Sequence, residues 1–168
     1  WQATDQLYLS GSVAYLDFEW TKYDGQCYFN APAALFSTRV PGNCNYDGFT
    51  NQLAPKTTAM LSAEYTWPIG NLELRTTLDA TYSADYLISL TLDPNAKQDS
   101  YTKLNARIAL SGEERRWELA VVARNLTDEQ VLSYAGDTPL AGSIFGARSY
   151  YGFVDPPRTV AIEGSYRF

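Results

Sequence analysis

Hydrophobic and polar residues alternate with a period of two along much of the chain. The clearest segment runs from Leu72 to Tyr86, where leucine, threonine, alanine and tyrosine occupy the even positions. The charged residues of this segment all lie at odd positions: Glu73, Arg75, Asp79 and Asp85. Successive side chains of a β-strand point to opposite faces, so the segment has one apolar and one charged face. A helix would scatter both sets around its circumference, which favours the strand.

Five more segments show the same period, although in the first of them the alternation blurs towards its end. They are Leu7–Tyr15, Ala59–Trp67, Tyr101–Ser111, Trp117–Arg124 and Val160–Phe168. None of the eight prolines falls inside the cores of these segments, as a hydrogen-bonded ladder requires. We therefore predict six antiparallel strands.

The connections between these segments alternate in length. Three are predicted as tight turns, Ala3–Gln6, Pro68–Asn71 and Gly112–Arg116, and three are long, Thr21–Lys56, Leu87–Ser100 and Leu126–Arg158. In an up-and-down sheet the three turns would share one end and the three loops the other. Short turns at one end and long loops at the other are typical of outer-membrane β-barrels.

Strand length and aromatic placement separate two all-β fold classes. The predicted strands span about 9 to 15 residues, whereas globular strands usually have about 5 to 6 and membrane strands need about 9 to 11. Aromatic residues form two bands, one at the turn end (Tyr65, Trp67, Trp117, Tyr166, Phe168) and one at the loop end (Tyr15, Tyr82, Tyr86). Two such bands flank the apolar belt of membrane barrels. We predict an antiparallel up-and-down transmembrane β-barrel segment, with a soluble β-sandwich as the alternative.

Composition narrows the function classes. Aromatic residues make up 14% of the chain, with tyrosine commonest among them, and histidine is absent. The net charge of −6 argues against nucleic acid as a partner, because phosphate binding needs clustered Lys and Arg. Without histidine or any nucleophile or phosphate-binding motif, we expect neither an enzyme nor a cofactor or metal site. No apolar run is long enough for a membrane helix.

The two cysteines, Cys27 and Cys44, lie 17 positions apart in a segment rich in Gly, Pro and Asn. An even cysteine count in such a loop indicates a disulfide and an oxidising compartment, with two free thiols as the alternative. A lone pair without histidine is a poor zinc site.

Several segments resemble TonB-dependent receptors of Gram-negative bacteria. Arg124–Glu129, which reads RNLTDE after a predicted strand, resembles the signature near the C-terminus of these receptors. Pro157–Val160 and Gly164–Phe168 resemble the start and end of their last strand. Asp24–Tyr28 and Leu53–Lys56 also resemble members of this family.

The resemblance implies that residues 1–168 form the C-terminal part of a receptor barrel of about 22 strands. It also implies partners that lie outside this sequence: the remainder of the barrel, the plug domain inside it, and the TonB complex, which the family engages through an N-terminal TonB box. Six strands alone would leave two open edges, and unpaired backbone groups in lipid cost several kcal/mol each. The implied function is energised uptake of a scarce small ligand across the outer membrane, by the family's default an iron–siderophore. The sequence does not specify the ligand.

Three sets of site residues follow. In the family, aromatic residues at alternating positions before a final Phe are read by the barrel-assembly machinery, which implies that role for Ile162, Gly164, Tyr166 and Phe168. Alternation predicts a lumen-facing set that serves mainly as structural packing: Arg75, Asp79, Lys103, Arg107, Arg124, Glu163 and Arg167. Loop aromatics can stack on a ligand or on each other; the candidates are Tyr28, Phe29, Tyr46, Phe49, Tyr150 and Tyr151.

The connection lengths also predict how the strands are oriented across the outer membrane. Short periplasmic turns place Phe168 at the periplasmic rim, the Cys27–Cys44 loop outside the cell, and the apolar strand faces against outer-membrane lipids. Besides the transport receptor, we keep two alternatives: a structural or adhesive outer-membrane barrel without energised transport, and a soluble carbohydrate-binding β-sandwich. Dependence on detergent separates the last from the others.

Overall fold

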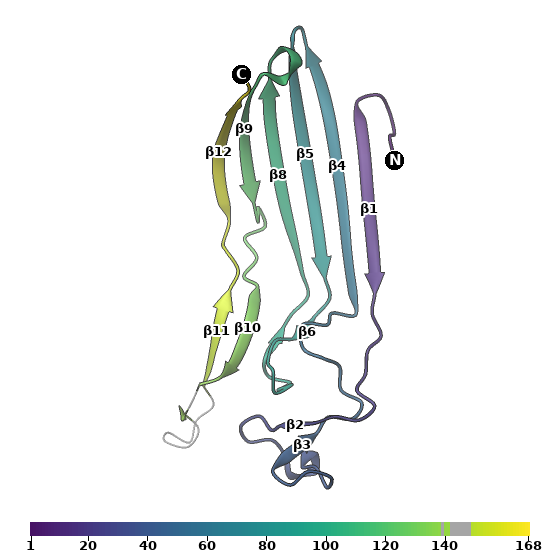
Figure 1. The fold of residues 1–168 in the computed structure, drawn as a ribbon, viewed down its shortest axis with the longest axis vertical. Coiled ribbons are helices and arrows are strands. Elements are labelled where there is room, and N and C mark those ends of the chain that lie inside the picture. The colour runs from purple at the N-terminus through teal and green to yellow at the C-terminus, as the bar shows by residue number, and fades with distance from the viewer. Residues whose placement is uncertain (139, 142–148) are drawn as a thin grey trace.

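The computed structural model describes residues 1–138, 140–141 and 149–168. Its main feature is a six-stranded antiparallel sheet (Figure 1). The spatial order of its strands, β1-β4-β5-β8-β9-β12, is also their order along the chain. The strands are β1 (Leu7–Tyr15), β4 (Thr57–Ile69), β5 (Leu72–Ser83), β8 (Tyr101–Ser111), β9 (Trp117–Arg124) and β12 (Thr159–Tyr166). This confirms the six predicted strands and the antiparallel up-and-down fold, here as an open sheet with β1 and β12 at its edges.

The register assigns the two faces as the alternation predicted. Leu78 on β5 lies between Ala63 of β4 and Ala106 of β8, and Ile108 on β8 lies beside Val121 of β9. Both Leu78 and Ile108 are 51% exposed. Within the part of the chain that the structure describes, no second layer covers this apolar face, which contradicts a β-sandwich.

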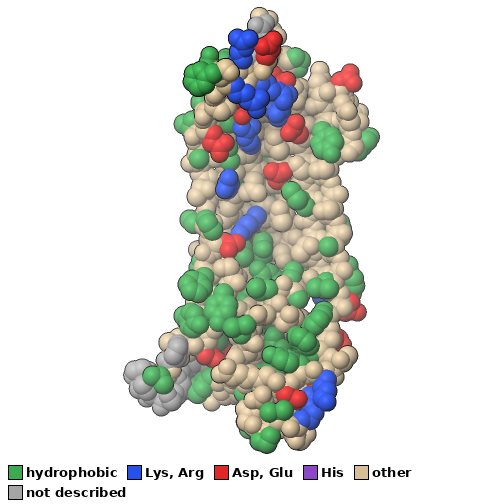
Figure 2. All heavy atoms as spheres, in the orientation of Figure 1, with side chains coloured by type: hydrophobic (Ala, Val, Ile, Leu, Met, Phe, Trp, Pro, Cys, Tyr) green, Lys and Arg blue, Asp and Glu red, His purple; other side chains and the backbone are tan. Residues whose placement is uncertain are grey.

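The opposite face of the sheet is charged. Asp79 lies between Ser62 and Asn105, and Arg107 lies between Thr77 and Val122. Figure 2 shows acidic and basic side chains gathered over the half of this face nearest the turns, with hydrophobic side chains prominent nearer the loops.

All three turns and both chain ends lie at one end of the sheet (Figure 1). The expected turn at Pro68–Asn71 is shorter than predicted, because β4 continues through Pro68 and Ile69 and only Gly70 and Asn71 connect it to β5. Thr66 donates its N–H to Gln6 beyond the start of β1. An N–H at position 68 would point to the same side of β4 as that of Thr66, where β1 has not yet begun, so the proline removes no hydrogen bond of the ladder. Gly70 has φ +60°, which glycine adopts without steric cost.

The long connections contain three short hairpins that the alternation pattern does not predict. They are β2 (Asp24–Gln26) with β3 (Asn43–Asn45), β6 (Tyr86–Leu87) with β7 (Lys97–Gln98), and β10 (Leu132–Asp137) with β11 (Tyr150–Val154). A 3₁₀ turn (Ala33–Leu35) lies between β2 and β3, and another (Glu113–Arg115) joins β8 to β9. The strand predicted to reach Tyr86 ends at Ser83, where the chain turns into the β6–β7 hairpin.

The apolar core lies among the loops rather than under the sheet. One cluster contains Cys44, Tyr46 and Leu92, and a second contains Ile88, Ala96 and Ala135. Each cluster joins residues from two of the long connections. Among the described residues no helix is long and apolar enough to cross a membrane.

Candidate functional site

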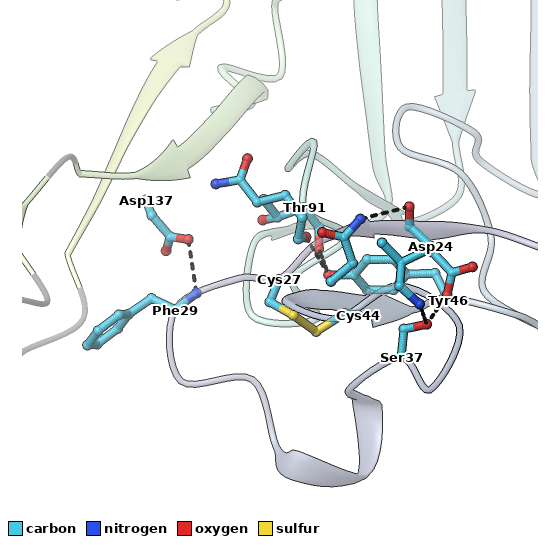
Figure 3. Close-up of a disulfide and its surroundings, with 11 residues drawn as sticks. Asp24, Cys27, Phe29, Ser37, Cys44, Tyr46, Thr91 and Asp137 are labelled. Carbon is cyan, nitrogen blue, oxygen red and sulfur yellow. Dashed lines mark hydrogen bonds between the residues drawn. A yellow bond between two sulfur atoms is a disulfide. The ribbon is translucent and has the colours of Figure 1, made fainter.

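The disulfide between Cys27 and Cys44 is present and confirms the prediction (Figure 3). Its Cα atoms are 5.0 Å apart, and the β2–β3 hairpin pairs Gly25 with Cys44. A Cβ on Gly25 would lie 2.9 Å from the Tyr23 ring, so the hairpin needs glycine there. The Cys44 side of the bridge is fully buried.

Arg39 holds the same loop together through charge. Its Nε lies 2.8 Å from Asp24 Oδ2 and its Nη2 lies 2.8 Å from Asp47 Oδ1, with Asn45 Oδ1 at 3.0 Å. The hydrogen bonds from Arg39 lower the pKa of the Asp47 carboxyl to about 2 and also lower that of Asp24. The same bonds raise the pKa of the Arg39 guanidinium. Sequence spacing does not reveal this ionic cluster, because its members lie 6 to 15 positions from Arg39 in an irregular loop, where no periodic pattern relates them.

Tyr46 joins the first long loop to the second. Its ring is 1% exposed, and its hydroxyl lies 2.9 Å from Gln26 O and 2.7 Å from Thr91 O. Burial raises the pKa of this phenol to about 12. The ring therefore supports the loop and packs against Tyr23 and Phe49, and its contact with a ligand stays a prediction.

The third long loop is tied to the other two. Phe29 donates its backbone N–H to Asp137 of β10 at 3.3 Å (Figure 3). Tyr150 of β11 donates its hydroxyl to Asp93 at 2.7 Å, and Asp93 also accepts the Asn95 backbone N–H. The Asp93 carboxylate is fully buried. Together with Tyr46 these contacts join residues 16–56, 84–100 and 125–158 into what we call the loop block, within the described residues.

The other aromatic residues predicted to contact a ligand differ in how exposed their side chains are. Tyr28 is 6% exposed, Phe29, Phe49 and Tyr150 are half-buried, and Tyr151 is 42% exposed. Tyr151 forms a cluster with Tyr134 and Phe153, whose ring centroids lie 5.8 and 6.4 Å from its own. Contact of these rings with a ligand stays a prediction.

The residues predicted to face a lumen share the charged face, and several form ion pairs there. Three ion pairs have nitrogen–oxygen distances of 2.6 Å: Arg107 Nη2 with Glu118 Oε1, Lys103 Nζ with Asp155 Oδ2, and Arg75 Nη2 with Glu73 Oε1. The register puts Arg124 opposite Thr159 and Glu163 opposite Ala120, while Arg167 follows β12 and donates its backbone N–H to Arg116. These pairs agree with structural packing, and their facing a lumen stays a prediction.

The four residues of the predicted assembly signal lie at the free edge of the sheet. Ile162, Gly164 and Tyr166 pair with Val121, Leu119 and Trp117 on the apolar face. The Phe168 ring stacks edge-on against Tyr166 at 5.1 Å and is fully exposed. Their recognition by assembly machinery stays a prediction. Among the described residues no group of three or more acidic or cysteine side chains could hold a metal ion.

Three solved structures of siderophore receptors are similar to this fold. BauA, the ferric preacinetobactin receptor of Acinetobacter baumannii, matches 98% of the chain with a TM-score of 0.62 and 19% identity. The siderophore receptor PiuA of the same species matches 96% at 0.62 and 20% identity. The ferric yersiniabactin uptake receptor FyuA of Yersinia pestis matches 74% at 0.57 and 19% identity. No family model and no curated protein matches the sequence.

The three receptors are much longer than this chain, which spans 17 to 20% of their length. At this identity the likeness shows the fold. The chain is thus an antiparallel sheet whose fold matches part of these structures, and its place in the C-terminal part of a receptor stays a prediction.

Proposed function

We propose that this chain forms the last strands and extracellular loops of an outer-membrane receptor that takes up a scarce ligand by TonB-dependent transport, by default an iron–siderophore. The observation that carries the proposal is the two-faced sheet: its uncovered apolar face suits lipid and its charged face suits a water-filled or plugged lumen. The likeness to receptors that bind ferric siderophores supports the same class of ligand.

The proposal includes partners and a location. The edges β1 and β12 expose backbone groups that further strands of the barrel would pair. A plug domain would meet the charged face, and TonB would act through the plug. The loop block would lie outside the cell and Phe168 at the periplasmic rim.

Uptake by cells tests this function. Disruption of the gene that encodes the chain should abolish energy-dependent uptake of one radiolabelled ferric siderophore and leave its binding to other receptors unchanged. The panel should include cobalamin and oligosaccharides as alternative ligands. A protein that reaches the outer membrane while every uptake activity survives its loss would instead be a structural or adhesive barrel. A native protein that is monodisperse in buffer without detergent would contradict the membrane location.

A further inference from the structure

An open pocket of about 780 Å³ lies in the loop between β1 and β4. Its walls combine aromatic rings with uncharged polar groups: Tyr28, Phe29, Phe36, Asn30, Ser37 and Asn43. The Phe36 side chain is 55% exposed. Pockets of about 300–1,000 Å³ with aromatic walls and a few polar groups are typical of small-molecule sites.

Contacts with neighbouring residues hold the lining residues of this pocket in place. Phe36 forms a β-bridge with Cys44, and the disulfide joins Cys44 to Cys27, which also lines the pocket. Ser37 donates its hydroxyl to Asp24, which Arg39 also binds. A site that is ordered before the ligand arrives avoids part of the entropy cost of binding.

The charge around this pocket argues against an anion. Among the described residues, none of those that line the pocket is charged. Arg39, two positions after Ser37, is neutralised by Asp24 and Asp47. The sequence of the loop block, residues 16–56, 84–100 and 125–158, carries eleven acidic and six basic residues, so the field at this end of the chain repels anions.

We propose that the pocket binds an uncharged group that carries a planar ring with hydroxyl or amide substituents. This inference rests on the proposed receptor function, because it assigns part of the ligand to one loop. The ring stacks against the exposed side chain of Phe36. The side-chain amides of Asn30 and Asn43 donate to and accept from its substituents.

Two probes of equal size test the proposal on the detergent-purified protein that contains this chain. 4-Hydroxybenzamide is neutral and 4-hydroxybenzoate is its anionic isostere, and saturation-transfer NMR titrations give the affinity of each. We expect the amide to bind and the carboxylate to bind about tenfold more weakly, because the uncharged walls leave its charge unpaired. Failure of the amide to bind, or equal affinities, would overturn the proposal.

Variants localise the site. Phe36→Ala should weaken binding of 4-hydroxybenzamide about tenfold, since the ring contact and its buried area are lost. Phe153→Ala removes an exposed ring from another loop and should leave the affinity unchanged. Equal effects of the two would overturn the assignment to this pocket.

A charge variant gives a readout that does not depend on loss of binding. Asn30 has φ +60°, a conformation that aspartate also tolerates. Asn30→Asp should therefore fold, tighten binding of the cation 4-hydroxybenzylammonium and weaken that of 4-hydroxybenzoate. An unchanged order of affinities would overturn the proposal. Uptake that persists while no probe binds would refute only the pocket, whereas probe binding without any uptake would refute only the transport function.

Discussion

At the scale of single residues, neighbours along one strand have opposite surroundings. Leu78 lies on the uncovered apolar face of β5, and Asp79, the next residue, lies on the charged face between Ser62 and Asn105. A shift of one position in the register would move every charged side chain of β5 onto the apolar face. A charge should therefore be tolerated at one position and costly at the next.

We predict that Leu78→Arg destabilises the folded protein in lipid vesicles by about 2–4 kcal/mol, because the charge would sit near the middle of the apolar face. The matched control Asp79→Arg places the same side chain on the charged face and should cost much less. Equilibrium unfolding in vesicles measures both. Similar losses for the two variants would contradict the assignment of lipid to the apolar face.

Acid should loosen the loop that Arg39 holds. Asp24 and Asp47 have pKa values below the ordinary 3.8, and that of Asp47 is about 2. A carboxyl with a lowered folded-state pKa stabilises above its unfolded value and loses that stabilisation as pH falls through the folded value. Proteolysis of the loop by pepsin should thus increase between about pH 4 and pH 2. Arg39→Gln should remove most of this pH dependence; a variant with the same profile as the wild type would show that other groups control it.

At the scale of elements, the small hairpins depend on crosslinks. β2 and β3 have three residues each, and an isolated two-stranded hairpin is marginal in water. The disulfide, the Arg39 ion pairs and the Tyr46 ring supply what the backbone pairing lacks. The long strands of the main sheet need no such help, because each inner strand pairs on both sides.

Replacing both cysteines by serine should therefore destabilise the first loop and spare the sheet. Chain-entropy arithmetic for a closed loop of this size gives a loss of about 3 kcal/mol. Hydrogen exchange should accelerate in residues 20–50 and stay slow in β5 and β8. Non-reducing peptide mapping provides the control on the wild type: two alkylatable thiols in fresh protein would contradict the bonded state.

At the scale of the whole molecule, the loop block is a packed unit at one end of a single-layer sheet. Asp93 is central to it, because its buried carboxylate accepts a hydrogen bond from the Tyr150 hydroxyl of the third loop. Close by in the second loop, the Thr91 carbonyl accepts a hydrogen bond from the Tyr46 hydroxyl of the first. A buried acceptor that loses its donor costs about 1–3 kcal/mol. We therefore expect the three loops to open together rather than one at a time.

Tyr150→Phe tests this coupling. It removes the hydroxyl that Asp93 accepts, so hydrogen exchange should accelerate in the second loop as well as in the third. Tyr151→Phe is the matched control, because its hydroxyl is exposed and meets Tyr134 only at 3.4 Å. Acceleration confined to the third loop would argue against a single unit.

The direction of the sheet across the membrane is a separate prediction. Leu90 is exposed in the loop block and Asn71 lies in the turn between β4 and β5. Leu90→Cys should react with a membrane-impermeant maleimide on intact cells, and Asn71→Cys only after lysis, because short turns are periplasmic in such barrels. The reverse pattern would invert the proposed topology.

Much of this architecture could be predicted from the sequence because strand faces follow a local rule. The period of two depends only on where successive side chains point, so it assigned Leu78, Asp79, Ile108 and Arg107 to their faces correctly. The passage of β4 through Pro68 was not predicted. It depends on where β1 ends, which is a matter of pairing between strands.

The loops show the limit of local rules. A disulfide was inferred from an even cysteine count, but the burial of Tyr46, the Arg39 cluster and the Tyr150–Asp93 bond join positions that no short pattern relates. The sequence by itself determined the strands, their two faces and the end at which the long loops gather, because these follow from side-chain alternation and connection length. Only the tertiary structure decided which loop aromatics are buried and which line a pocket, because that depends on contacts between segments up to 108 positions apart.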